Sequence, residues 1–192
     1  MLRSCVGILL LVQCLPAFGC QAQVKHAEEQ IGGAVLPAPE ELREGARVYG
    51  YAEDGSLVSL REGTNALTCL ADNPGDEQFH AACYHNALEP YMARGRELRA
   101  DGIVGQESLR IRHEEAEAGK LAMPDQPAAV YNLMAPLDTF DPAKTRVGLY
   151  AVYIPYATQA STGIPEQPVA PGAPWIMRAG TPSAHIMIAP TQ

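Results

Sequence analysis

The sequence predicts an α+β fold: one domain dominated by an antiparallel sheet, with a main helix over about residues 90–101 and a long Pro/Gly-rich loop. Sixteen prolines and seventeen glycines among 192 residues favour short strands joined by turns. Asp54-Gly55 separates two β-rich runs, which is a strong hairpin signal because glycine accepts a positive φ. Pro90 and Gly102 are suited to the first turn and to the end of a helix.

The first half of the domain is expected to be an antiparallel meander. The hairpin spans Arg47–Leu60, and residues 66–70 supply a third strand. Residues 79–84 then alternate as a strand would, with Phe79 and Cys83 on one face. The same two residues are also spaced i, i+4, so a helix is the alternative for this segment.

The second half contains two further strands, over residues 128–134 and 147–154, and a closing hairpin formed by 175–177 and 184–188. Residues 157–174 form a long loop without a clear period, and loops of this length are often functional or disordered. Residues 106–119 are ambiguous between strand and helix, because alternation is followed by a helix-favouring composition.

Residues 1–22 are expected to be an export signal. Arg3 precedes an apolar run of about fourteen residues, which is short of the roughly twenty needed to cross a bilayer. Cleavage after Ala22 would release a soluble protein. Cleavage before Cys20 would produce a lipoprotein anchored through that cysteine, although Ala17 and Phe18 are unusual for a lipobox. The product would be periplasmic or extracellular.

Residues 23–44 are interpreted as a linker or a loosely ordered arm, and residues 45–192 as one globular domain. Within the linker, residues 39–43 could form a single helical turn. Cys69 and Cys83 are the two cysteines inside that domain, an even pair suited to an oxidising compartment. A disulfide between them would stabilise the fold by about 3 kcal/mol in the chain-entropy treatment.

The charge balance argues against nucleic acid as a partner. Without Arg3 the chain has 13 basic and 22 acidic side chains, whereas nucleic-acid affinity comes largely from Lys and Arg. The same acidity disfavours adsorption to anionic lipid, so contact with a membrane is expected only through a lipid anchor at Cys20. The expected partner is a small molecule or an envelope protein.

The histidines are weak catalytic candidates. His185 and His113 could act as acid–base groups. A nucleophile could come from Ser161, Thr162, Thr181 or Ser183, but no nucleophile-elbow pattern surrounds any of them. His80 belongs to the densest cluster of potential metal ligands, with Cys83 and His85. In a strand, however, His80 and His85 point to opposite faces, so neither a metal nor a cofactor is predicted.

Trp175 and Met177 follow a Pro/Gly-rich loop and are the candidate binding residues, with Trp175 as an anchor of that loop being the structural alternative. Two functions are compatible with these features. The first is a non-catalytic module that binds a ligand or a protein. The second is an extracytoplasmic hydrolase or metal-assisted enzyme that uses His185 with other histidines and carboxylates.

Overall fold

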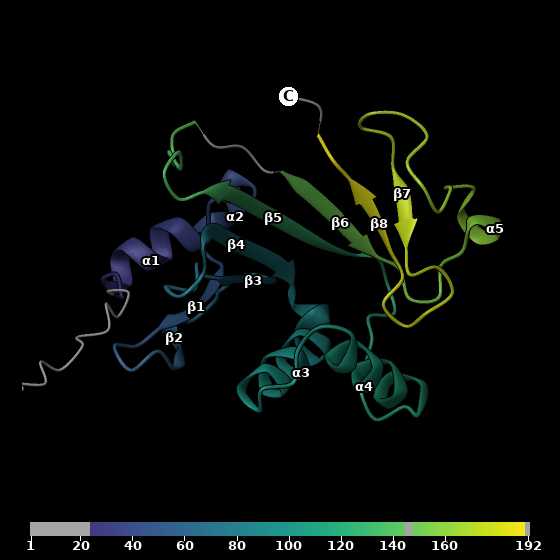
Figure 1. The fold of residues 1–192 in the computed structure, drawn as a ribbon, viewed down its shortest axis with the longest axis horizontal. Coiled ribbons are helices and arrows are strands. Elements are labelled where there is room, and N and C mark those ends of the chain that lie inside the picture. The colour runs from purple at the N-terminus through teal and green to yellow at the C-terminus, as the bar shows by residue number, and fades with distance from the viewer. Residues whose placement is uncertain (1–23, 145–147, 191–192) are drawn as a thin grey trace, which may run out of the picture.

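A computed structural model describes residues 24–144 and 148–190 (Figure 1). The predicted export signal, including Cys20, lies outside the described residues. Eight strands form a single sheet in the order β2-β1-β3-β4-β5-β6-β8-β7. All neighbouring strands are antiparallel apart from the parallel pair β1–β3. The predicted α+β class, with its dominant antiparallel sheet, is confirmed.

The strands are β1 (Arg47–Tyr51), β2 (Leu57–Arg61), β3 (Leu67–Leu70), β4 (Gln78–His85), β5 (Ala128–Pro136), β6 (Leu149–Tyr153), β7 (Trp175–Met177) and β8 (His185–Ile188). The helices are α1 (Ala27–Ala34), α2 (Glu40–Arg43), α3 (Glu89–Ala100), α4 (Gly105–Glu117) and α5 (Gln159–Thr162), and a 3₁₀ turn (Asn86–Leu88) precedes α3. No helix in the described ranges is long and apolar enough to cross a membrane.

The β1–β2 hairpin forms as predicted, with Gly55 at a φ of 80° in its turn. The predicted meander is wrong beyond that point, because β3 pairs with β1 in parallel and leaves β2 at the edge of the sheet. The reason lies in the two strands. Val48 of β1 is fully buried, whereas β2 has no buried residue and exposes Leu57 and Ser59, which suits an edge strand.

Cys69 and Cys83 form the predicted disulfide across the antiparallel β3–β4 pair. Their Cα atoms lie 4.0 Å apart, and neither residue is accessible to solvent. The strand interpretation of residues 79–84 is thereby confirmed, since β4 includes both Phe79 and Cys83. The bond fastens two neighbouring strands near the middle of the sheet.

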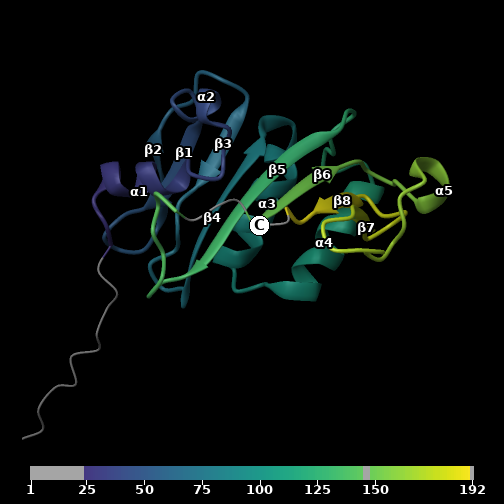
Figure 2. The same ribbon diagram turned by 90° about the horizontal axis from the view of Figure 1, so that it is seen from above.

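Helices cover both faces of the sheet (Figures 1 and 2). Phe79, Ala81 and Cys83 of β4 face α1, and the sulfur of Cys83 lies 3.3 Å from the carbonyl oxygen of Ala34. The alternate residue Tyr84 faces α3, where it packs in one cluster with Tyr91. Successive residues of β4 therefore pack into the core on opposite faces of the sheet.

Residues 23–44, interpreted from the sequence as a linker or loosely ordered arm, contain two helices packed on the sheet. Ala34 and Ala38 are buried among core residues of β1, β3 and β4. The guanidinium of Arg43 donates to the carbonyl oxygens of Ala38 and Leu36, each at 2.9 Å, which closes the connection from α1 to α2. Because small side chains make these contacts, the segment lacks the apolar periodicity by which a packed helix is predicted from sequence. The helical turn expected over residues 39–43 corresponds to α2.

The main predicted helix is α3, and the ambiguous segment 106–119 forms a second helix, α4. The two are joined by a fork between the guanidinium of Arg94 and both carboxylate oxygens of Glu115, with Nε–Oε2 and Nη2–Oε1 distances of 2.8 Å. Gly95 allows close approach, because a Cβ there would lie 3.0 Å from Arg112. The closing hairpin is confirmed as β7–β8, and the loop over 157–174 includes the short helix α5.

Candidate functional site

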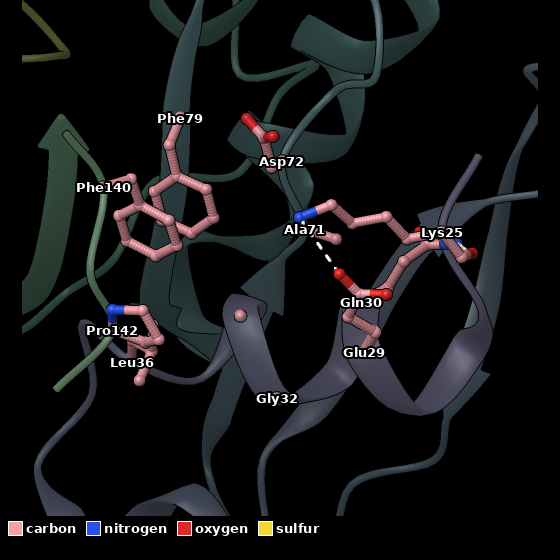
Figure 3. A pocket seen from close by; sticks show the side chains of 11 residues that line it. Lys25, Glu29, Gln30, Gly32, Leu36, Ala71, Asp72, Phe79, Phe140 and Pro142 are labelled. Carbon is pink, nitrogen blue, oxygen red and sulfur yellow. Dashed lines mark hydrogen bonds and ion pairs between the residues drawn. The ribbon is translucent and has the colours of Figure 1, made fainter. Parts of the chain in front are cut away.

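A cavity of about 530 Å³ lies between α1, the β3–β4 connection and the segment that follows β5 (Figure 3). Its size is within the range of small-molecule sites, about 300–1,000 Å³. Most of the lining is apolar, with charged groups at one end. The lining residues are Lys25, Glu29, Gln30, Gly32, Gly33, Leu36, Ala71, Asp72, Phe79, Phe140 and Pro142.

Two stacked phenylalanines form the aromatic wall. Phe79 comes from β4 and Phe140 from the β5–β6 connection, and their ring centroids are 3.7 Å apart with planes 12° from parallel. Leu36 packs against the same cluster and lies with Pro142 at this end of the cavity. Phe79 is 2% exposed, so the cluster fixes its ring, while Phe140 belongs to a surface connection.

Two glycines of α1, Gly32 and Gly33, also line the cavity. A Cβ on Gly33 would lie 3.5 Å from the ring of Phe79, while a Cβ on Gly32 would meet nothing within 4 Å. Glycine inside a helix costs about 0.5–1 kcal/mol relative to alanine. Neither glycine has a positive φ. Their effect in the structure is to keep the helix surface open beside the aromatic wall.

Charged side chains lie at the other end of the cavity (Figure 3). Nζ of Lys25 is 3.3 Å from a carboxylate oxygen of Glu29, and its chain extends toward Asp72. Burial raises the pKa of Asp72, opposed by a hydrogen bond from the backbone N–H of His80 (2.9 Å) and by the charge of Lys25. The cavity thus combines an apolar body with an acid and an amine.

Gln30 fixes α1 to the sheet at this end. Its amide nitrogen donates to the carbonyl oxygens of Lys25 (2.8 Å) and Tyr51 (2.9 Å), and its amide oxygen accepts from the N–H of Tyr51 (2.8 Å). Gly50 permits this contact, because a Cβ there would lie 2.5 Å from the amide oxygen of Gln30. The helical wall of the cavity is therefore held by a buried side chain.

The three predicted histidines do not share one cavity. His185 is buried and stacked on Tyr153, with ring centroids 4.7 Å apart, and its Nδ1 lies 2.7 Å from the carbonyl oxygen of Ser183. Nε2 of His113 lies 2.6 Å from the hydroxyl oxygen of the same Ser183. His80 is exposed on β4 and lines a different cavity.

The His113–Ser183 pair has the composition of a catalytic dyad but not its access. Ser183 has no exposed surface, so a substrate carbonyl could not reach its hydroxyl without rearrangement of the fold. The pair links α4 to the turn before β8. Burial lowers the pKa of His113, with Arg178 and Arg112 acting in the same direction and Glu117 opposing them. Burial likewise lowers the pKa of His185, opposed by its hydrogen bond with Ser183.

The predicted binding residues Trp175 and Met177 lie on β7, at an edge of the sheet. Trp175 is partly buried and packs against the cluster on the α3 face. Met177 is 37% exposed. The intervening Ile176 donates its N–H to the carbonyl oxygen of Pro165, at 2.8 Å, so the long loop is attached to this strand. The backbone of Ile176 thus attaches the loop while Trp175 packs on the core, and a binding role for Trp175 and Met177 stays a prediction.

Sequence reasoning missed the cavity beside α1. Phe79 and Phe140 are distant in the chain, and the segment that contains Gly32-Gly33 was interpreted as a linker. Across the described ranges, no group of three or more His, Cys, Asp or Glu side chains could hold a metal ion. Comparisons with protein-family models, curated proteins and solved structures find no match for this chain.

Proposed function

We propose that this chain is an exported, non-catalytic binding module whose cavity beside α1 takes a small aromatic molecule. The observation that carries the proposal is the pair of stacked rings of Phe79 and Phe140, which lines a cavity of about 530 Å³ together with two glycines of α1. Aromatic walls favour aromatic ligands, because offset or edge-on ring contacts add about 0.5–1.5 kcal/mol beyond the burial of area.

The charged end defines the ligand further. Lys25 can donate to an oxygen of the ligand and Asp72 can accept from a hydroxyl or amine, so a ring with a polar substituent matches both ends of the cavity. A few polar groups in an otherwise apolar cavity are the usual arrangement for orienting a small molecule. Phenols and indoles belong to this class.

Export and anchoring are part of the same proposal. The disulfide is compatible with an oxidising compartment, in which such bonds persist. The apolar leader and Cys20 motivate the alternative of a lipid-anchored form. Intact-mass measurement of the protein from the envelope fraction distinguishes an acylated Cys20 from a chain that begins after Ala22.

The binding proposal is tested by isothermal titration with 2-naphthol and indole. Gly32→Leu places a side chain in the open space at the helix surface, and Gly32→Ala is the matched control that adds one carbon. Wild type and Gly32→Ala should bind a probe, while Gly32→Leu should weaken binding by about tenfold or more at unchanged helix content. Absence of binding to wild type, or equal affinity for all three proteins, contradicts the proposal.

The alternative function, an extracytoplasmic hydrolase, is less well supported. His113 and His185 both contact Ser183, which favours it, but the serine is fully buried and His80 lies elsewhere. Hydrolysis of p-nitrophenyl esters by wild type, lost in Ser183→Ala but retained in Ser161→Ala, would reverse this preference. Ser161 serves as the control because it lies on α5, where it forms a capping box with the N-cap residue Thr158.

A further inference from the structure

A second cavity, of about 620 Å³, lies on the opposite face of the sheet from α1. It is enclosed by the C-terminal half of α3, the turn of the β1–β2 hairpin and the β3–β4 connection. Its lining includes apolar side chains from three strands, Leu57, Leu70 and Ala82. Polar and charged groups surround this apolar surface.

Two opposite charges line this cavity without pairing with each other. Arg99 extends from α3, and Asp76 lies at the end of the β3–β4 loop. Among the described residues, neither side chain has an ion-pair partner within 4.0 Å. By contrast, Arg96, which lines the same cavity, forms an ion pair with Glu89 (2.5 Å) and donates a hydrogen bond to the hydroxyl of Tyr84 (2.7 Å).

The charges of Asp76 and Arg99 affect the pKa of Tyr51 in opposite directions. Burial raises the pKa of Tyr51, the negative charge of Asp76 raises it further, and the positive charge of Arg99 lowers it. Tyr51 itself lines the cavity. An exposed guanidinium and an exposed carboxylate therefore line one cavity that also has an apolar surface.

Asp76 is positioned by its own loop. Its carboxylate accepts a hydrogen bond of 2.8 Å from the side-chain amide of Asn73, whose oxygen in turn accepts from the N–H of Gly75 at 3.2 Å. One hydrogen bond leaves most of the acceptor capacity of a carboxylate free. Arg99 has five N–H donors, and among the described residues its side chain makes no hydrogen bond or ion pair.

We infer that this second cavity binds a zwitterion, namely a free apolar amino acid or a short apolar peptide. Arg99 receives the carboxylate of the ligand through paired N–H donors, which is the geometry that a guanidinium favours. Asp76 receives the ammonium group. The apolar side chain of the ligand packs on Leu57, Leu70 and Ala82. A simple anion would instead meet the repulsion of Asp76, and a simple cation that of Arg99.

The test uses leucine and its two singly charged derivatives, N-acetyl-leucine and leucinamide, in isothermal titration with the wild-type protein. Leucine should bind about fivefold or more tightly than either derivative, because each derivative forfeits one charge-assisted hydrogen bond. Equal binding of all three compounds, or no binding of leucine and of leucyl-leucine, overturns the inference. Because these compounds are aliphatic, failure here is separate from failure of aromatic probes in the cavity beside α1.

Two variants assign the charges. Arg99→Gln should remove the preference for leucine over leucinamide, and Asp76→Asn should remove the preference over N-acetyl-leucine. Arg110→Gln is the matched control, because Arg110 lies on α4 and pairs with Glu107 and Glu114 outside this cavity. A control variant that loses the preference as strongly as Arg99→Gln, or an Arg99→Gln protein that keeps it, contradicts the assignment.

Discussion

Removal of the Cys69–Cys83 disulfide should destabilise the fold by about 3 kcal/mol. The bond joins residues separated by 14 positions, and the chain-entropy treatment gives about 3 kcal/mol for a loop of this length. Both cysteines are fully buried, so the double Cys→Ala variant also loses packing around two sulfur positions. The expected loss is therefore at least the entropic value.

Urea unfolding followed by the fluorescence of Trp175, the single tryptophan, measures this loss. With a slope of about 1–3 kcal/mol per molar urea, the unfolding midpoint should fall by about 1–3 M. Wild-type protein reduced with dithiothreitol is the control, and its midpoint should move in the same direction. A midpoint unchanged in both proteins would refute the reasoning that this bond restricts the unfolded chain.

Three further predictions concern the helix glycine and the two histidines that contact Ser183. Gly32→Ala should raise the free energy of unfolding by about 0.5–1 kcal/mol in the same urea assay, because a Cβ at this position meets nothing; a loss of stability would contradict this. Ser183→Ala should lower it by about 1–3 kcal/mol, because His113 loses its hydrogen-bond partner; an unchanged midpoint would show that the pair contributes nothing. Stability should be constant above about pH 6.5 and fall as the pH decreases below that value, because the pKa values of His113 and His185 are lowered in the folded protein and the unfolded chain then binds more protons. His185→Phe should reduce this dependence in urea midpoints measured at pH 7.5 and 5.5, and an unaltered pH profile would exclude His185 as its source.

The sequence was informative where a short pattern determines local structure. Asp54-Gly55 favours a tight turn in which glycine takes a positive φ, so the hairpin was predictable. Pro90 and Gly102 marked the ends of α3 to within a residue or two. The disulfide followed from counting cysteines. These features depend on residues that are close in the chain or restricted by covalent chemistry.

The features that were missed depend on partners distant in the chain. The parallel pairing of β1 with β3 could not be predicted, because alternation within a strand does not show which other strand lies beside it. Helix α1 is held by Gln30 and by small alanines rather than by an apolar stripe. The cavity beside it depends on Phe140, which only the tertiary fold brings onto Phe79.

Ala71 lines both cavities, one on each side of the sheet. Its N–H donates to the carbonyl oxygen of Tyr49 at 2.9 Å, so this partition is tied to β1 from the end of β3. A ligand in one cavity that displaced Ala71 would change the affinity of the other cavity, and by linkage the effect would be equal in both directions.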